Sequence, residues 1–225
     1  MNSVPFINIH SHNSVNGQAV SISNVFVHKR QDISPKGMYS LGLHPWHLLE
    51  ATLDFDVTST LQYYIDNDSS FIAIGEIGID HAIAIPIEFQ TKLFEAQLLV
   101  AQKNDLPVII HCVRAFSELI HLKKKLALTV PLIIHGYCAK PSITQELLKH
   151  GFCFSFGSAL LSGNKNAIDA LITIPSNRIF FETDDQKCTI EDIYTIASEI
   201  KGIDIEELKT IVFENVRCCF NRFNC

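Results

Sequence analysis

The chain of 225 residues lacks any apolar run of about 18 residues, the length that a membrane-spanning helix needs. Its first residues, Met1 to Pro5, lack the basic segment and the apolar segment that open a secretory signal peptide. No part of the chain has low complexity or the composition of a linker. We therefore expect a soluble, cytoplasmic protein with a single domain over residues 1–225, long enough to bury a sizeable core.

Cysteine occurs without a pattern that indicates disulfides or a cysteine-based zinc site. The seven cysteines are an odd number, and no two of them have the Cys-x-x-Cys spacing. We expect reduced thiols, as is typical of cytosolic proteins.

Positive charge is scarce. The 18 Lys and Arg residues are outnumbered by 24 Asp and Glu residues, which gives a formal net charge of −6. A protein that binds duplex DNA through its phosphates needs a stripe of Lys and Arg, so the composition argues against such a face. It does not exclude a short nucleic-acid end held by metal ions, because the charges of the ions then dominate locally.

Short runs of β-branched and aromatic residues alternate with helical periodicity from residue 71 onward. These runs are apolar at odd and even positions alike, which is typical of parallel strands covered on both faces. They span residues 71–76, 107–111, 131–135, 152–156 and 178–182. Between the first two runs, the helical spacing of Phe89, Leu93, Ala96 and Val100 predicts one buried stripe. The alternation predicts repeated βα units.

Three earlier runs, at residues 6–10, 20–27 and 38–44, bring the number of predicted strands to eight. They lie so close together that we expect the first one or two helices to be shortened or missing. An open, flavodoxin-like sheet also fits the alternation. The pattern favours a TIM-like (β/α) barrel, because the carboxyl ends of all barrel strands converge on one mouth, where residues of the metal-ligand type would meet.

Such residues follow the apolar runs at several places. His10 and His12 are two residues apart, so both side chains leave an extended strand on the same side. The full set consists of His10, His12, His44, Glu76, His111, His135 and Asp184. Imidazoles combined with carboxylates suit Zn, Mn, Ni, Co or Mg, so the set predicts a metal centre.

In their order along the chain, the motifs resemble those of the TatD family of metal-dependent hydrolases, within the amidohydrolase-like barrels. They are His10-Ser11-His12, Gly42-Leu43-His44-Pro45, Gly75-Glu76-Ile77-Gly78-Ile79-Asp80, the helix with Gln90 and Gln97, Pro107 through His111, Ile134-His135-Gly136-Tyr137, Glu182-Thr183-Asp184 and Asn215. The resemblance covers nearly the whole length. It implies one metal ion held by His10, His12, Glu76 and Asp184, and a second held by Glu76, His111 and His135. Family members are described as divalent-metal nucleases, often acting from DNA ends.

A phosphodiesterase is the function that this resemblance favours. Two cations lower the pKa of a bridging water and clamp the attacking and leaving oxygens. We expect Asp184 to bind a metal ion and take the proton of the water, and Glu76 to bridge the two ions. His44, His47 and Arg114 are expected to hold the phosphate. The expected cofactors are two divalent cations, and the expected substrate is DNA or another phosphodiester, at ends or in single strands.

Departures from the family pattern, among them Asn8 where many relatives carry Asp and Asp185 after the Glu-Thr-Asp motif, concern the substrate rather than the metal. Trp46 and His47 replace a common His-Pro-His pattern, and Arg114 lies three residues after the strand-five histidine, where relatives have it two residues after. Trp46 is the only tryptophan. It is expected either to stack on a base or to be buried at the mouth of the barrel.

Two other functions remain open. The same activated water in an amidohydrolase-like enzyme would attack an amide, ester or lactone of a small molecule, and the fold alone does not decide between these bonds. The low basic content and the shifted Arg114 favour that alternative, whereas Glu76, at the position of a carboxylated lysine in such enzymes, favours the nuclease. The third hypothesis is a metal-binding protein without turnover. The presence of all six metal ligands that the resemblance implies argues against it.

Overall fold

The computed structural model of the chain describes residues 4–12, 19–29, 34, 37–49 and 56–224. Its strands are β1 (Ile7–Ser11), β2 (Val20–Phe26), β3 (Met38–Gly42), β4 (Phe71–Asp80), β5 (Val108–Val113), β6 (Leu132–Ile134), β7 (Cys153–Phe156) and β8 (Ile179–Phe181). They follow one another in the sheet in the order of the sequence, and the pairings are parallel. A flavodoxin-like sheet would reverse its order at a switch point. The predicted (β/α) barrel class is therefore confirmed.

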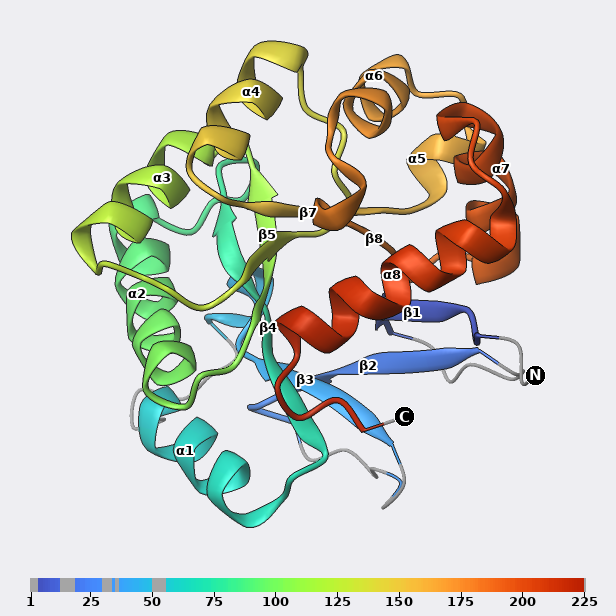
Figure 1. The fold of residues 1–225 in the computed structure, drawn as a ribbon. Coiled ribbons are helices and arrows are strands. Elements are labelled where there is room, and N and C mark those ends of the chain that lie inside the picture. The colour runs from blue at the N-terminus through green and yellow to red at the C-terminus, as the bar shows by residue number, and fades with distance from the viewer. Residues whose placement is uncertain (1–3, 13–18, 30–33, 35–36, 50–55, 225) are drawn as a thin grey trace. The chain divides into compact units, whose positions relative to one another are not determined.

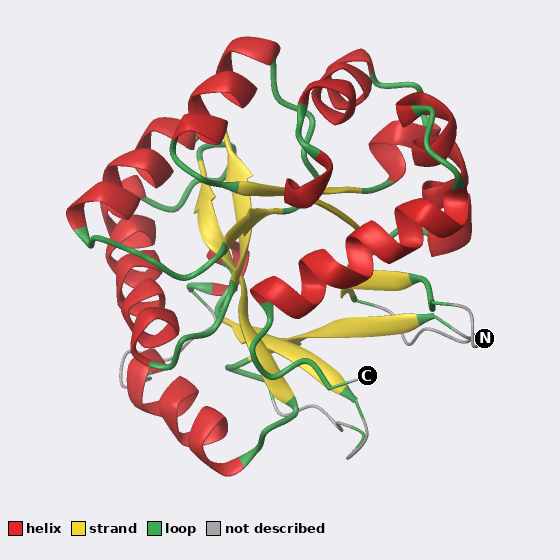
Figure 2. Ribbon diagram, in the orientation of Figure 1, coloured by secondary structure: helices red, strands yellow, loops and turns green. Residues whose placement is uncertain are grey.

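Helices alternate with strands after β3 (Figures 1 and 2). They are α1 (Val57–Asn67), α2 (Ile87–Lys103), α3 (Phe116–Lys125), α4 (Pro141–Lys149), α5 (Ser158–Leu161), α6 (Lys165–Thr173), α7 (Ile190–Lys201) and α8 (Ile205–Cys219), with 3-10 turns η1 (Pro45–His47) and η2 (Ser176–Arg178). Among the described residues that separate β1 from β2 and β2 from β3, none is helical, in agreement with the prediction. No helix within the described ranges has the length and apolar character that a membrane crossing requires.

The chain forms two compact units. The first consists of residues 1–23 and 133–219, and the second of residues 24–132 and 220–225. The single domain predicted for residues 1–225 stays a prediction.

In the first unit, β1 is tied to the C-terminal third of the chain. The buried hydroxyl of Tyr194 on α7 donates to the carbonyl oxygen of Ile7 at 3.1 Å and accepts from its N–H at 3.3 Å. A capping box of Thr189 and Asp192 starts α7, and Gly202, with φ 64°, ends it. Helices α7 and α8 pack on each other and on β8.

In the second unit, all ten residues of β4 are buried, and the strand continues to Asp80, past the predicted end at residue 76. Helix α2 packs on β4, and α1 packs on α2. The predicted buried stripe on α2 is confirmed at Val100 but wrong at Phe89, which is 42% exposed. The buried face of the helix combines Phe94, Leu98, Val100 and Ala101 with Gln90 and Gln97.

These two glutamines hold the ends of strands by hydrogen bonds to the backbone. Gln97 accepts from the N–H of Leu43 at 2.8 Å and donates to its carbonyl oxygen at 3.1 Å. Gln90 binds the backbone N–H and carbonyl of Asp80 at 2.8 and 3.0 Å. Because buried backbone groups need partners, each amide fixes a strand end next to a residue of the site.

Candidate metal centre

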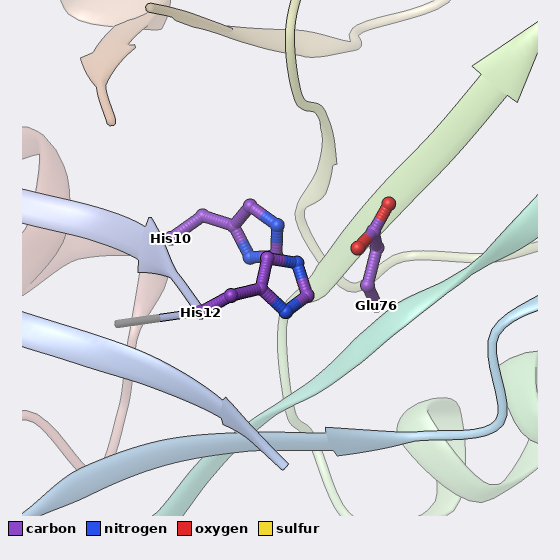
Figure 3. A group of neighbouring side chains, drawn as sticks. All are labelled: His10, His12 and Glu76. Carbon is purple, nitrogen blue, oxygen red and sulfur yellow. The ribbon is translucent and has the colours of Figure 1, made fainter. Parts of the chain in front are cut away.

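A first cluster of ligand-type side chains belongs to the first unit and consists of His10, His12, His135 and Asp184. The carboxylate oxygen Oδ1 of Asp184 lies 3.6 Å from Nε2 of His10 and 3.4 Å from Nε2 of His12. The ring of His10 contacts those of His12 and His135 at centroid distances of 4.9 and 4.8 Å. Figure 3 shows His10 and His12 side by side at the carboxyl end of β1. One ligand atom from each of His10, His135 and Asp184 lies within 4.8 Å of the others.

The backbone fixes this cluster across a long sequence separation. The N–H of Asp184 donates to the carbonyl oxygen of His10 at 3.0 Å, and the N–H of His12 donates to the carbonyl oxygen of Asp184 at 3.1 Å. Asp184 has a φ of 53°, a left-handed conformation that aspartate tolerates better than most residues. The chain after β8 thereby bends back along the end of β1.

A buried carboxylate supports His135. Oε1 of Glu182 accepts the N–H of Gly136 at 2.6 Å and lies 3.3 Å from Nδ1 of His135. Glu182 has no exposed surface. A carboxylate on one imidazole nitrogen fixes the tautomer and leaves the other nitrogen to bind a metal ion.

A second cluster belongs to the second unit and consists of His44, Glu76 and His111. Oε1 of Glu76, which Figure 3 shows on β4, lies 3.1 Å from Nε2 of His44 and 2.9 Å from Nδ1 of His111. All three residues are buried. The N–H of Trp46 donates to Nδ1 of His44 at 3.2 Å, so the proton of this imidazole is on Nε2 and points to Glu76.

Buried polar side chains hold the second cluster in place. Oδ1 of Asn24 accepts the backbone N–H of Glu76 at 2.5 Å and the hydroxyl of Ser40 at 3.1 Å. Gly78 brings β4 close to β5, since a Cβ there would lie 1.8 Å from the carbonyl oxygen of His111. Only glycine permits this close approach of the two backbones.

Asp80 connects His111 to Trp46. Its Oδ2 accepts the indole N–H of Trp46 at 2.7 Å and lies 3.2 Å from Nε2 of His111, while its Oδ1 accepts the N–H of Ala82 at 2.7 Å. Burial raises the pKa of Asp80, but the hydrogen bonds from Trp46, Ala82 and His111 outweigh it, so the pKa lies below its ordinary value. Asp80 is therefore an anion at neutral pH.

The neighbouring thiol has the opposite character. Burial raises the pKa of Cys112 to about 12. The protonated thiol is a poor nucleophile and a poor metal ligand at neutral pH. The chemistry of this site is thus left to imidazoles and carboxylates.

The three residues predicted to hold a phosphate differ in their burial and in their neighbours. His44 is buried and belongs to the second cluster. His47 is half-buried, and its ring contacts those of Phe26 and His28 at 4.7 and 4.9 Å. Arg114 is exposed after β5, with a φ of 57°. Their role in binding phosphate stays a prediction.

Sequence reasoning missed three supporting residues: Glu182, Asp80 and Asn24. The first two stand inside motifs shared with the family, at Glu182-Thr183-Asp184 and at the end of the run that begins with Gly75. A carboxylate at the end of an apolar strand run is the signal that could have found them. Asn24 lies in an ordinary alternating strand and gives no such signal.

Comparison with known proteins gives a consistent match. Residues 15–221 match the family model described as TatD related DNase. The uncharacterized metal-dependent hydrolase MG009 of Mycoplasma genitalium is 31% identical over 206 residues, covering 80% of this chain and 77% of the relative. The putative deoxyribonuclease tatdn3 of Danio rerio is 28% identical over 183 residues, covering 74% and 68%.

A solved structure agrees in fold. The crystal structure of YJJV, a TatD homologue from Escherichia coli, superposes with a TM-score of 0.81 at 21% identity and covers 96% of this chain and 98% of its own. At this identity the similarity shows the fold alone.

Proposed function

Since this chain belongs to the family of TatD-related DNases and is a metal-dependent hydrolase, we propose that it cleaves phosphodiester bonds of nucleic acids, at strand ends or in single strands. The names of two relatives, a metal-dependent hydrolase and a putative deoxyribonuclease, support the proposal. The formal charge of −6 favours short or single-stranded substrates over a long duplex.

The observation that carries the proposal is the set of donor atoms. Glu76, with 4% of its side chain exposed, directs one carboxylate oxygen at two imidazole nitrogens. In the first cluster Asp184 lies in the same way beside His10 and His12. Buried carboxylates and imidazoles without a cation would be costly, so the donor set fits divalent metal ions.

The proposed assignment follows the order of the motifs. One ion is held by His10, His12, Glu76 and Asp184, and a second by Glu76, His111 and His135. It rests on the general property that parallel barrel strands converge at their carboxyl ends. Two ions, when bound, supply an acidified water and neutralise charge on the phosphate.

The side chains themselves then have distinct tasks. Asp184, with 34% of its side chain exposed, is the carboxylate open to solvent, and we assign it the proton of the attacking water. Glu182 and Asp80 orient His135 and His111. His44, His47 and Arg114 bind the phosphate and position it for attack.

The test is hydrolysis of bis(p-nitrophenyl) phosphate and of end-labelled single-stranded and duplex DNA and RNA, with Mg, Mn and Zn in turn. Wild type is compared with Asp184→Asn and with Asp185→Asn, a matched control because Asp185 is the exposed neighbour. We expect metal-dependent cleavage that is lost in Asp184→Asn and kept in Asp185→Asn. Equal rates in both variants would contradict the site. If the protein binds metal but cleaves no phosphodiester, the favoured function becomes hydrolysis of an amide, ester or lactone. If it hydrolyses none of those either, the favoured function is a metal-binding protein without turnover.

A further inference from the structure

Trp46 presents an exposed aromatic surface beside the second cluster. We propose that its indole ring is the stacking platform for one unpaired base of the substrate strand, next to the phosphate that is cleaved. This inference rests on the proposed nuclease function and adds to it a residue that selects substrates carrying a base.

The first observation is exposure. The side chain of Trp46 is 59% exposed, so the sequence-based alternative of a buried tryptophan is wrong. It lies in η1, two residues after His44. Burial removes apolar surface from water, so an exposed tryptophan ring gains little stability from its own fold.

The second observation is that the ring is held in one orientation. Its only polar atom, the indole N–H, is bound to the buried carboxylate of Asp80 at 2.7 Å. Its backbone N–H is bound to His44, so the main chain is fixed as well. The surface that remains for solvent is carbon and π face, which suits a flat aromatic partner rather than a polar one. A fixed ring also loses little entropy when a base stacks on it.

The third observation is the position of the ring. Its centroid lies 5.1 Å from that of His44 and 5.8 Å from that of His111. Asp80 touches Trp46 and His111 at once. A base stacked on Trp46 would therefore be adjacent to residues proposed to bind phosphate and metal, within the span of one nucleotide. Stacking tolerates every base, so the platform gives a preference for strands with bases and not for a sequence.

The kinetic test compares kcat/KM for a single-stranded oligonucleotide with that for a strand of the same length that is abasic at its terminal positions. We expect wild type to prefer the intact strand by about 5- to 150-fold, the range expected for one base–aromatic stack. Trp46→Leu should lose this preference. Tyr63→Leu is the matched control, since Tyr63 on α1 is an exposed aromatic residue of 64% exposure, and it should keep the preference.

A ratio of two substrates separates stacking from a structural role. If Trp46 only supports Asp80 and His111, Trp46→Leu lowers both rates alike, and the proposal is overturned. It is also overturned if wild type cleaves both strands equally well in an Asp184-dependent reaction, although the nuclease function then stands. Cleavage of neither strand would instead contradict the proposed function.

Fluorescence gives a readout that does not require turnover. Trp46 is the only tryptophan, so emission excited selectively from tryptophan reports on this ring alone. We expect the intact strand to quench the emission of the wild-type protein on mixing, and the abasic strand to leave it unchanged. Equal quenching by both strands would overturn the proposal.

Discussion

Replacing Glu182 by glutamine is expected to weaken metal binding without removing a metal ligand. Oε1 of Glu182 lies 3.3 Å from Nδ1 of His135 and accepts the N–H of Gly136. Glutamine still accepts the Gly136 bond, but the charge that stabilises the proton on Nδ1 is lost. Loss of such a carboxylate behind a histidine ligand typically lowers metal affinity about 10- to 100-fold, which corresponds to roughly 1.4 to 2.8 kcal/mol.

The same substitution has a separate effect on folding stability. Oε2 of Glu182 is buried and has no hydrogen-bond partner among the described residues. In glutamine the side-chain oxygen keeps the Gly136 bond and the NH2 group takes the place of Oε2, where a buried donor without an acceptor costs about 1 to 3 kcal/mol. We therefore expect a lower free energy of unfolding in the metal-free protein as well.

The assay is calorimetric titration of metal-free protein with Mn or Zn, together with urea unfolding. Glu199→Gln is the control, because Glu199 is exposed on α7 and the same change there should alter stability by less than about 0.5 kcal/mol. If Glu182→Gln binds both metals as tightly as wild type while remaining folded, the link between Glu182 and His135 is refuted.

Three further outcomes are expected. Tyr194→Phe should lower the free energy of unfolding by about 1 to 3 kcal/mol in urea titrations, because the backbone N–H and carbonyl of Ile7 lose their buried partner; an unchanged midpoint would contradict this. Burial raises the pKa of Glu118, but hydrogen bonds from Ser117 and His81 lower it by more, to below the ordinary 4.5. The stability from Glu118 is therefore complete at neutral pH and lost as pH falls through the lowered pKa. Glu118→Gln should have a lower free energy of unfolding than wild type at neutral pH, and the two proteins should be equally stable well below pH 4.5. The same difference in stability at both pH values would contradict this. Finally, metal at about 100 times its Kd should stabilise the protein by about 2.7 kcal/mol and raise Tm by roughly 5 to 11 °C in a chain of this size, and a chelator should reverse the shift.

The strands from residue 71 onward were predictable from sequence because their runs are apolar at odd and even positions alike. The run at residues 152–156 lies within one residue of β7, and the run at residues 178–182 includes β8. The two buried glutamines of α2, Gln90 and Gln97, were not predictable, since they lie among apolar residues on the buried face of the helix. These glutamines are buried because they form hydrogen bonds to the backbone at strand ends, and the periodicity of apolar residues carries no information about such bonds.

The candidate site shows the same division. His10, His111 and Asp184 come at the ends of apolar runs, so the sequence alone identifies them as candidate metal ligands by their position and residue type. The partners Asn24 and Asp80 depend on contacts between segments that are far apart in the sequence, as in the bond from the N–H of Glu76 to Asn24. Such contacts are set by register, which a single sequence does not reveal.

The backbone link between the end of β1 and Asp184 bears on how a newly made chain acquires its metal. His10 and His12 are synthesised early, but the residue whose backbone binds theirs follows more than 170 positions later. Contacts between residues so far apart in the sequence form slowly, and during synthesis the N-terminal segment is made long before its partner. The first cluster therefore does not exist as a binding site on a partly synthesised chain. A metal site that needs this backbone link can form only after Asp184 has been synthesised.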